Sequence, residues 1–381
     1  MAETRRLDET VDRNRGVPHR PEHEEVDGAV LFLHKDYEPP TFRALDPWEL
    51  QIEHICRSIS KRTGLLWRLG CHPHGLQAGT ARLLACTLTD AVSIINSEVW
   101  SSSCPENQYH DIEVALNVIY RRLLGVEAKT ASVAVWHELG VASVATRISA
   151  AALKLRNNIL SLDPRDFLVR RVYDGLMNDS KGRGSSRNGA LFLENLASEA
   201  NWPGPLKKPA AKKFVNEFVA SRRVSELADG FKRMSTLRNM SNWAEKERFG
   251  LPEYLLKTCP SSLREGRRLK TKFRLGCHDL RSSSSRTQLV RNAQCPCCES
   301  RESETIQHTL FECKAFEEER AAFFARLYSV CPLARQLTDE YRCRLVMGAK
   351  LPREIENPLY RYLIAISKLR LGILTEQGEG S

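Results

Sequence analysis

The sequence contains no apolar run close to the roughly 18–20 residues that a membrane-spanning helix needs. Its first residues are rich in arginine and acidic side chains, and they lack the apolar centre of a signal peptide. With 42% hydrophobic and 27% charged residues, the 381-residue chain also differs from collagen-like and fully disordered sequences. We therefore expect an intracellular protein, in the cytoplasm or the nucleus, that has no membrane as a partner.

The alternation of polar and apolar residues that marks a half-buried strand is missing between residues 46 and 180. Apolar residues there recur at helical spacing, and Asp46 followed by Pro47 is a typical helix start. The sequence thus predicts a mainly α-helical protein. The expected helices cover residues 46–69, 76–100, 111–124, 141–162, 210–228, 261–275, 315–327, 333–347 and 353–374.

Polarity and helix-breaking residues divide the chain into segments. Residues 1–45 carry ten acidic and seven basic side chains, and only 29–33 resembles a strand, so we expect this segment to be largely disordered. The glycine- and proline-containing stretch 178–209 is predicted to be a linker without regular structure. The predicted units are a helical domain at 46–177, a helical region ending in a basic segment at 210–291, a cysteine-containing helical domain at 292–375 and a tail at 376–381.

Positive charge is concentrated near residues 264–291. This segment has nine basic and two acidic side chains, and it accounts for +7 of the chain's net charge of +10. Such a segment fits salt-dependent binding to the phosphates of RNA or DNA, and taken alone it fits a solvated surface equally well. The candidate nucleic-acid-binding residues are Arg264, Arg267, Arg268, Lys270, Lys272, Arg274, Arg281, Arg286 and Arg291. A second basic group, Lys207, Lys208, Lys212 and Lys213, is weaker evidence because it can simply decorate a helix start.

Four of the twelve cysteines form a pattern with a histidine, whereas the other eight are isolated and expected to be small buried hydrophobic residues. The spacing C-x2-C-x9-H-x4-C is typical of a zinc site, with Cys295, Cys298, His308 and Cys313 as ligands. Cys297 can replace either neighbouring cysteine as a ligand or be a bystander. A Cys3His set leaves no open position for a catalytic water, so the expected zinc is structural.

The second half of this pattern constrains the local helix, for which Ser303 is a candidate N-cap. His308 and Cys313 lie about 140° apart around an ideal helix. Both can face one metal ion only if the helix unwinds near Glu312. The spacing therefore predicts a helix that ends at the site.

A wider set of residues surrounds the cysteine cluster. It comprises Phe273-Arg-Leu-Gly-Cys-His-Asp-Leu280, Glu304-Thr305, His308-Thr-Leu-Phe-Glu-Cys313 and Arg320. Together with Cys295-Pro-Cys-Cys298, it resembles the C-terminal zinc-binding region of reverse transcriptases from non-long-terminal-repeat retrotransposons of the LINE or jockey type. More loosely, Gln51-Ile-Glu-His-Ile55, Leu65-Leu-Trp-Arg-Leu69 and Arg82-Leu-Leu84 resemble the family's helical region after the polymerase palm. The resemblance implies a thumb-like helical domain, a zinc module and RNA or DNA as partner.

The sequence lacks any pair of adjacent aspartates. The polymerase centre of that family uses a Tyr-x-Asp-Asp element and a further aspartate to hold two metal ions. The resemblance therefore implies a non-catalytic portion without catalytic residues of its own, expected to be inactive alone, whose palm lies upstream or in a separate polypeptide. Two other interpretations remain open: a zinc-stapled helical module that binds a protein, and a decayed element fragment without function.

Overall fold

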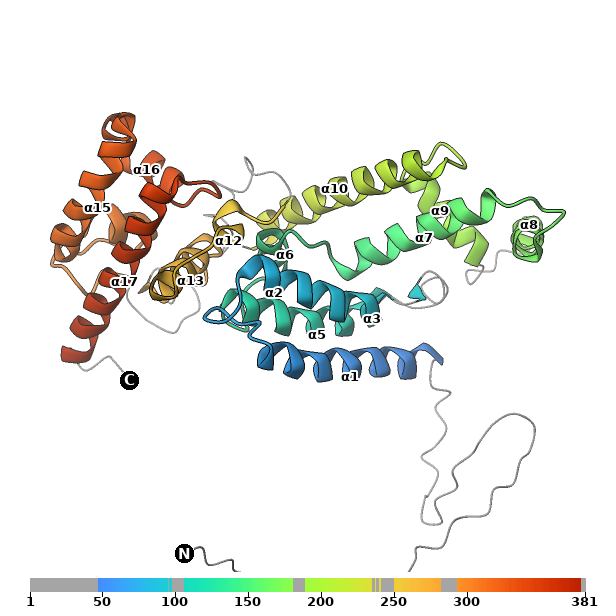
Figure 1. Ribbon diagram of the computed structural model, residues 1–381, viewed down its shortest axis with the longest axis horizontal. Helices are drawn as coiled ribbons and strands as arrows, with labels where there is room; N and C mark the ends of the chain where they lie inside the picture. Colours follow the sequence, from blue (N-terminus) through green and yellow to red (C-terminus); the bar gives the residue numbers. More distant parts are fainter. Residues whose placement is uncertain are drawn as a thin grey trace, which may run out of the picture. The chain divides into compact units, whose positions relative to one another are not determined.

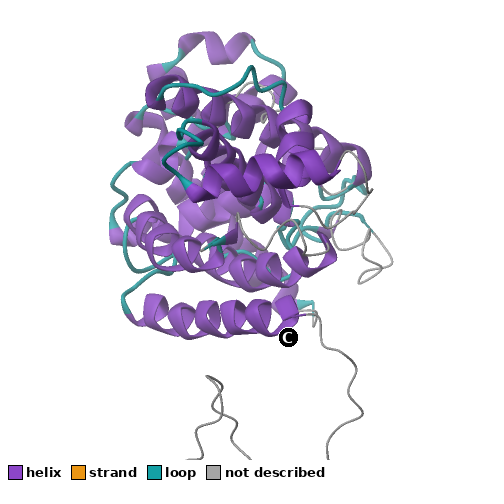
Figure 2. Ribbon diagram, turned by 90° about the vertical axis from the view of Figure 1, so that its right-hand side faces the viewer, coloured by secondary structure: helices purple, strands orange, loops and turns teal. Residues whose placement is uncertain are grey.

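The computed structural model of the protein describes residues 47–94, 96–97, 106–180, 189–234, 237, 240, 250–281 and 293–377. These residues form helices and loops, which confirms the expected mainly α-helical class (Figures 1 and 2). Extended backbone is paired in one isolated antiparallel bridge, between Gln294 and Ser303, within the part of the chain that is described. The disorder expected for residues 1–45 concerns residues outside the described ranges.

The first helices pack side by side (Figure 1). Helix α1 (Pro47–Arg68) begins at the predicted proline and buries Ile52, Ile55 and Ile59, which recur at the spacing of one helix face. It packs against α5 (Glu106–Leu124). The helix expected at 76–100 is divided, because α2 (Ala78–Ala85) passes through a π-helical turn, Cys86–Asp90, into the short α3 (Ala91–Ser93).

The middle of the chain contains more helix than the sequence suggested. The helix expected at 141–162 is α7 (Val144–Leu160). Its N-cap is Ser143, whose side chain accepts a hydrogen bond from the Thr146 N–H at 3.1 Å. The other helices here are α6 (Ser132–Leu139), α8 (Leu168–Ser180), α9 (Gly189–Glu199) and α10 (Lys208–Arg233).

The prediction that 178–209 lacks regular structure is wrong for α9. Leu193, Leu196 and Ala197 recur at helical spacing between two glycine-containing stretches, and the structure buries them in a second apolar core with α7, α8 and α10. Apolar periodicity outweighs the flanking glycines and prolines here.

Three C-terminal helices lie at their expected positions, α13 (Arg264–Arg274), α15 (Glu317–Val330) and α17 (Arg353–Glu376). The helix expected at 333–347 is shorter, because α16 (Asp339–Val346) begins only after a 3-10 turn at Pro332–Gln336. The short α12 (Glu253–Leu256) was not expected from the sequence. Helix α17 packs against both α13 and α15. One apolar core continues from α1 and α5 to α15 and α17, and the described helices belong to a single compact unit. In the described ranges, no helix has both the length and the apolar character that crossing a bilayer requires.

Candidate metal centre

A short turn presents the first two cysteine ligands. The Gln294–Ser303 bridge aligns two antiparallel segments, and the Cys295 N–H donates to the Glu302 carbonyl at 2.8 Å. The Cys-Pro-Cys-Cys sequence turns between these segments and carries Cys298 back toward Cys295. The local sequence therefore folds into a knuckle that directs two sulfur atoms to one point.

A π-helical turn at His308–Glu312 brings the other two ligands onto one side. The Cys313 N–H donates to the His308 carbonyl at 2.7 Å, five residues back, and Cys313 itself leaves the helical conformation with ψ at 121°. The expectation that the helix ends at the site is confirmed. The expected N-cap was wrong by two residues, because Thr305 rather than Ser303 accepts the hydrogen bond of the His308 N–H, at 3.0 Å.

The four ligand atoms surround one point, with every pair within 4.8 Å. The Cys295 and Cys313 sulfur atoms are 3.9 Å apart, and the Cys298 sulfur lies 3.4 Å from Nε2 of His308. Ligand bonds of about 2.3 Å to sulfur and 2.0–2.1 Å to nitrogen in a tetrahedral site require separations of about 3.8 and 3.6 Å. The residues therefore fit a tetrahedral metal ion.

Cys297 lies outside this group of four. Its sulfur instead groups with Cys295 and the buried carboxylate of Glu304. The geometry favours Cys298 over Cys297 as the second ligand, as the two-residue gap predicted. Cys297 thus lies beside the site, next to Cys295.

Hydrogen bonds between the sulfur atoms of the cluster favour the thiolate form of Cys295. Hydrogen bonds from the thiols of Cys297 and Cys313 hold the pKa of Cys295 far below its ordinary value. The same contacts raise the pKa of Cys297 and of Cys313 well above the ordinary range. Burial lowers the pKa of His308, but hydrogen bonds to Cys298 and Cys295 outweigh it and leave that pKa raised. Negative charge concentrated on buried sulfur suits a bound cation.

A second layer of side chains holds the ligands in place. Nδ1 of His308 lies 2.7 Å from a Glu302 carboxylate oxygen, which fixes the ring with Nε2 toward the metal position. Arg320 donates to the Cys313 carbonyl at 2.7 Å, and Tyr362 donates to the Leu310 carbonyl at 2.7 Å. Sequence reasoning missed Glu302 and Tyr362, because neither belongs to the ligand spacing.

Glu304 anchors the knuckle to the last helix. Its fully buried carboxylate forms two bonds with Arg370 of α17, at 2.6 and 3.0 Å, and accepts the Arg281 N–H at 2.7 Å. Glu304 and Thr305, which belong to the sequence pattern that resembles the reverse transcriptases, therefore have two structural roles here. Glu304 attaches the module to α17, and Thr305 begins the helix that carries His308.

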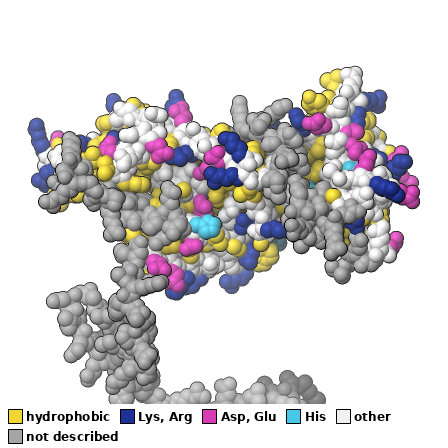
Figure 3. All heavy atoms as spheres, turned by 180° about the vertical axis from the view of Figure 1, so that it is seen from behind, with side chains coloured by type: hydrophobic (Ala, Val, Ile, Leu, Met, Phe, Trp, Pro, Cys, Tyr) yellow, Lys and Arg dark blue, Asp and Glu magenta, His cyan; other side chains and the backbone are white. Residues whose placement is uncertain are grey.

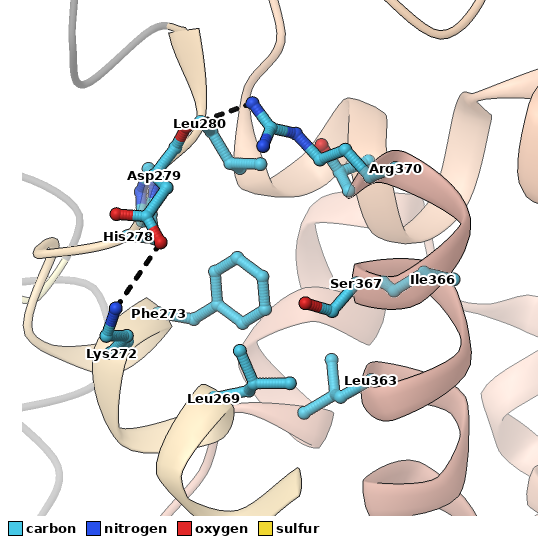
Figure 4. A pocket seen from close by; sticks show the side chains of 11 residues that line it. Leu269, Lys272, Phe273, His278, Asp279, Leu280, Leu363, Ile366, Ser367 and Arg370 are labelled. Atoms are coloured by element: carbon cyan, nitrogen blue, oxygen red, sulfur yellow. Dashed lines mark hydrogen bonds and ion pairs between the residues drawn. The ribbon is translucent and has the colours of Figure 1, made fainter. Parts of the chain in front are cut away.

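A cavity of about 50 Å³ lies between α13 and α17 beside the module (Figure 4). Its charged rim is paired, because Lys272 lies 3.3 Å from Asp279 and Arg370 donates to the Asp279 carbonyl at 2.9 Å. A cavity that binds benzene measures about 150 Å³. This one is too small for a nucleobase or cofactor.

Part of the basic segment lies inside the protein, where neither a nucleic acid nor solvent reaches it. Helix α13 buries Arg267, Lys270 and Arg274 on the side that faces the protein. Arg274 forms a bidentate pair with buried Glu138 at 2.7 and 3.1 Å, and Lys270 lies 3.8 Å from buried Glu356. Three of the predicted nucleic-acid-binding side chains are thus removed from the surface and serve interhelical packing.

The remaining basic side chains of the segment are partly accessible or undescribed. Arg268 bonds to Glu265 at 2.6 and 2.8 Å, Lys272 pairs with Asp279, and Arg264 donates to the carbonyl of His74. Arg281 is half-buried. Arg286 and Arg291 lie outside the described residues. Most positive charge of the described segment is therefore balanced by a nearby carboxylate.

Comparison of the chain with protein-family models, with curated protein sequences and with solved structures finds no match.

Proposed function

We propose that the chain is the nucleic-acid-binding C-terminal portion of a non-long-terminal-repeat reverse transcriptase, with a structural zinc ion and without the polymerase centre. The observation that carries this proposal is the convergence of Cys295, Cys298, His308 and Cys313, whose candidate ligand atoms all lie within 4.8 Å of one another. Residues around the ligands that belong to the same resemblance, such as Glu304 and Arg320, make specific supporting contacts. Three thiolates and one imidazole suit zinc, and a closed set of four gives it a folding role.

Helix α1 supports the nucleic-acid part of the proposal. Arg57, Lys61 and Arg68 are exposed and lie within about 40° of one another around the helix, opposite its buried isoleucines. Trp67, 50% exposed, adds an aromatic surface at the C-terminal end. In Figure 3 Lys and Arg side chains occur along the lower edge, which α1 forms. Basic side chains beside an exposed aromatic ring suit phosphates and unpaired bases.

The metal part is tested on the purified full chain. We expect about one zinc per chain, and we expect Cys298→Ser combined with His308→Ala to lose both the zinc and the binding of a fluorescent 30-nucleotide RNA or DNA. Cys331→Ser combined with His110→Ala is the matched control, because both residues lie outside the ligand group. A folded, metal-free wild-type chain would refute the zinc assignment.

The nucleic-acid part is tested by fluorescence anisotropy between 50 and 200 mM salt. The wild-type affinity should fall steeply with salt, by roughly 0.7–0.9 log units per log unit of salt for each phosphate contact. Replacing Arg57, Lys61 and Arg68 with Gln should reduce that slope by about 2. If the folded, zinc-loaded protein binds neither RNA nor DNA, the proposal is wrong.

Helix α8 favours the alternative of a protein-interaction module. Leu168, Val169, Val172 and Leu176 form a continuous arc on its surface, each between 41% and 66% exposed. Such an arc is typical of a helix that packs against another protein. A partner captured through α8, lost with Val172→Asp while nucleic-acid binding is absent, would support this alternative.

A further inference from the structure

Four exposed lysines gather at the start of α10, and we call Lys207, Lys208, Lys212 and Lys213 the lysine corner. Among these, Lys213 has a carboxylate near its ammonium group, that of Glu217 at 3.9 Å. The corner thus presents a concentrated positive charge at the surface. It contrasts with α13, where carboxylates accompany most of the basic side chains.

The protein holds the lysine corner in a fixed position. The buried side chain of Asn157 in α7 donates to the Leu206 carbonyl at 3.0 Å and accepts the Leu206 N–H at 2.7 Å. Four residues before Leu206, the ring of Trp202 packs on the ring of Phe214 in α10, with ring centres 4.6 Å apart. Leu206 before Lys207 and Ala211 and Phe214 after it are therefore anchored in the second apolar core. A ligand meets these ammonium groups on a prearranged backbone.

Helix stability does not explain these lysines. The first turn of α10 contains no acidic residue, and its N-cap, Lys207, forms no side-chain cap bond. Cations at this end oppose the helix dipole, and Lys208 and Lys212 stand one turn apart with like charge. Residues that oppose helix stability without a compensating contact inside the protein indicate a functional role.

We propose that the lysine corner binds the phosphate backbone of a nucleic acid, as a contact surface separate from α1. This inference rests on the proposed nucleic-acid function. Phosphates accept charge-assisted bonds from ammonium groups, and contacts of this kind fix position without reading sequence. An anionic membrane is the less suitable partner, because the described residues nearest the corner, 189–223, expose no large apolar side chain for insertion, and the exposed Val224 lies about three turns farther along α10.

The experiment compares two quadruple variants of the full chain. In the corner variant, Lys207, Lys208, Lys212 and Lys213 are each changed to Gln. In the control, Lys129, Lys232, Lys350 and Lys368, which are also exposed, are changed to Gln, so that both variants lose the same net charge. Affinity for a 30-base-pair DNA and a 30-nucleotide RNA is measured by anisotropy at 50, 100 and 200 mM salt.

We expect the corner variant to bind at least tenfold more weakly at 50 mM salt, with a salt slope smaller by roughly 2–4, about one unit for each lost lysine contact. The control should keep the wild-type slope within one unit. Removal of cations from the first turn should leave the melting temperature at or above that of wild type. In addition, bound nucleic acid should protect the corner lysines from acetylation, detected by mass spectrometry, while the control lysines react.

The outcomes separate this inference from the proposed function. Equal losses in both variants would show an effect of net charge alone and overturn the inference, as would unprotected corner lysines. A wild-type chain that binds no nucleic acid overturns both proposals. Binding of the corner to vesicles of phosphatidylserine and phosphatidylcholine, with no effect of its variant on nucleic-acid affinity, would overturn the inference in favour of a membrane partner.

Discussion

A carboxylate beside His308, one of the candidate metal ligands, sets the orientation of its ring. Glu302 faces Nδ1 of His308 at 2.7 Å, and Glu312 lies farther away at 3.7 Å. When Nδ1 donates to a carboxylate, Nε2 is free to bind the metal and becomes more basic. The affinity of the site should therefore depend on Glu302, although it is no ligand in the group of four.

Glu302→Gln should weaken zinc binding about 10–100-fold, because an amide is a poorer partner than a carboxylate for the Nδ1–H of His308. The measurement is competition with a chromophoric chelator at constant pH. Glu299→Gln is the matched control, since it removes the same charge from an exposed position close by. Equal affinities for the Glu302 and Glu299 variants would show that the carboxylate has no positioning role.

The sequence identifies the four candidate ligands but not the residues that support them. The candidates follow from local spacing, so Cys295, Cys298, His308 and Cys313 could be predicted, and they lie close enough together to bind one metal ion. Glu302 could not be separated from other exposed glutamates. The N-cap assignment to Ser303 failed because the Gln294–Ser303 bridge, which the sequence does not reveal, takes that residue out of the helix start.

Helix α13 illustrates how the same charged residues have different roles on two faces. Arg267, Lys270 and Arg274 follow one another at intervals of three and four residues, which places them on one side. Lys270 pairs with Glu356 and Arg274 pairs with Glu138, and both carboxylates lie far away along the chain. Sequence alone therefore could not show that this side of the helix is buried. A charged residue is buried only where folding supplies its partner.

Close contact between α13 and α17 depends on Gly266. A Cβ atom at this position would lie 2.6 Å from Cα and Cβ of Tyr360 and also strike its carbonyl oxygen. We expect Gly266→Ala to destabilise the protein by about 1–3 kcal/mol, because backbone atoms of α17 must move. Urea unfolding followed by far-UV circular dichroism measures the change.

Gly372→Ala in α17 is the control for this prediction. A Cβ there meets no atom within 4 Å, so the replacement should stabilise the helix by about 0.5–1 kcal/mol through the lower conformational freedom of alanine. A stability of Gly266→Ala equal to that of wild type would contradict the close approach of the two helices.

In the whole described unit, a continuous apolar core and a buried ion pair connect segments that the sequence analysis assigned to separate domains. Apolar residues from Ile55 in α1 to Leu363 in α17 belong to the same core. The pair between Glu138 and Arg274 joins α6 to α13, and Tyr254 of α12 also donates to Glu138. Sequence reasoning located most helices, because periodicity is local. It could not show that 46–177 and 292–375 share a core, which depends on contacts between distant residues.

Metal removal tests this continuity. A structural metal present at 1,000 times its dissociation constant contributes about 4 kcal/mol, so chelation should lower the melting temperature. Because the metal module shares a core with α1 and α5, we expect calorimetry to show one transition that shifts as a whole, with circular dichroism following the same curve. The variant with Cys298→Ser and His308→Ala should melt at the chelated temperature with or without chelator. Two separate transitions, only the lower one sensitive to chelator, would instead show that the module folds as an independent domain.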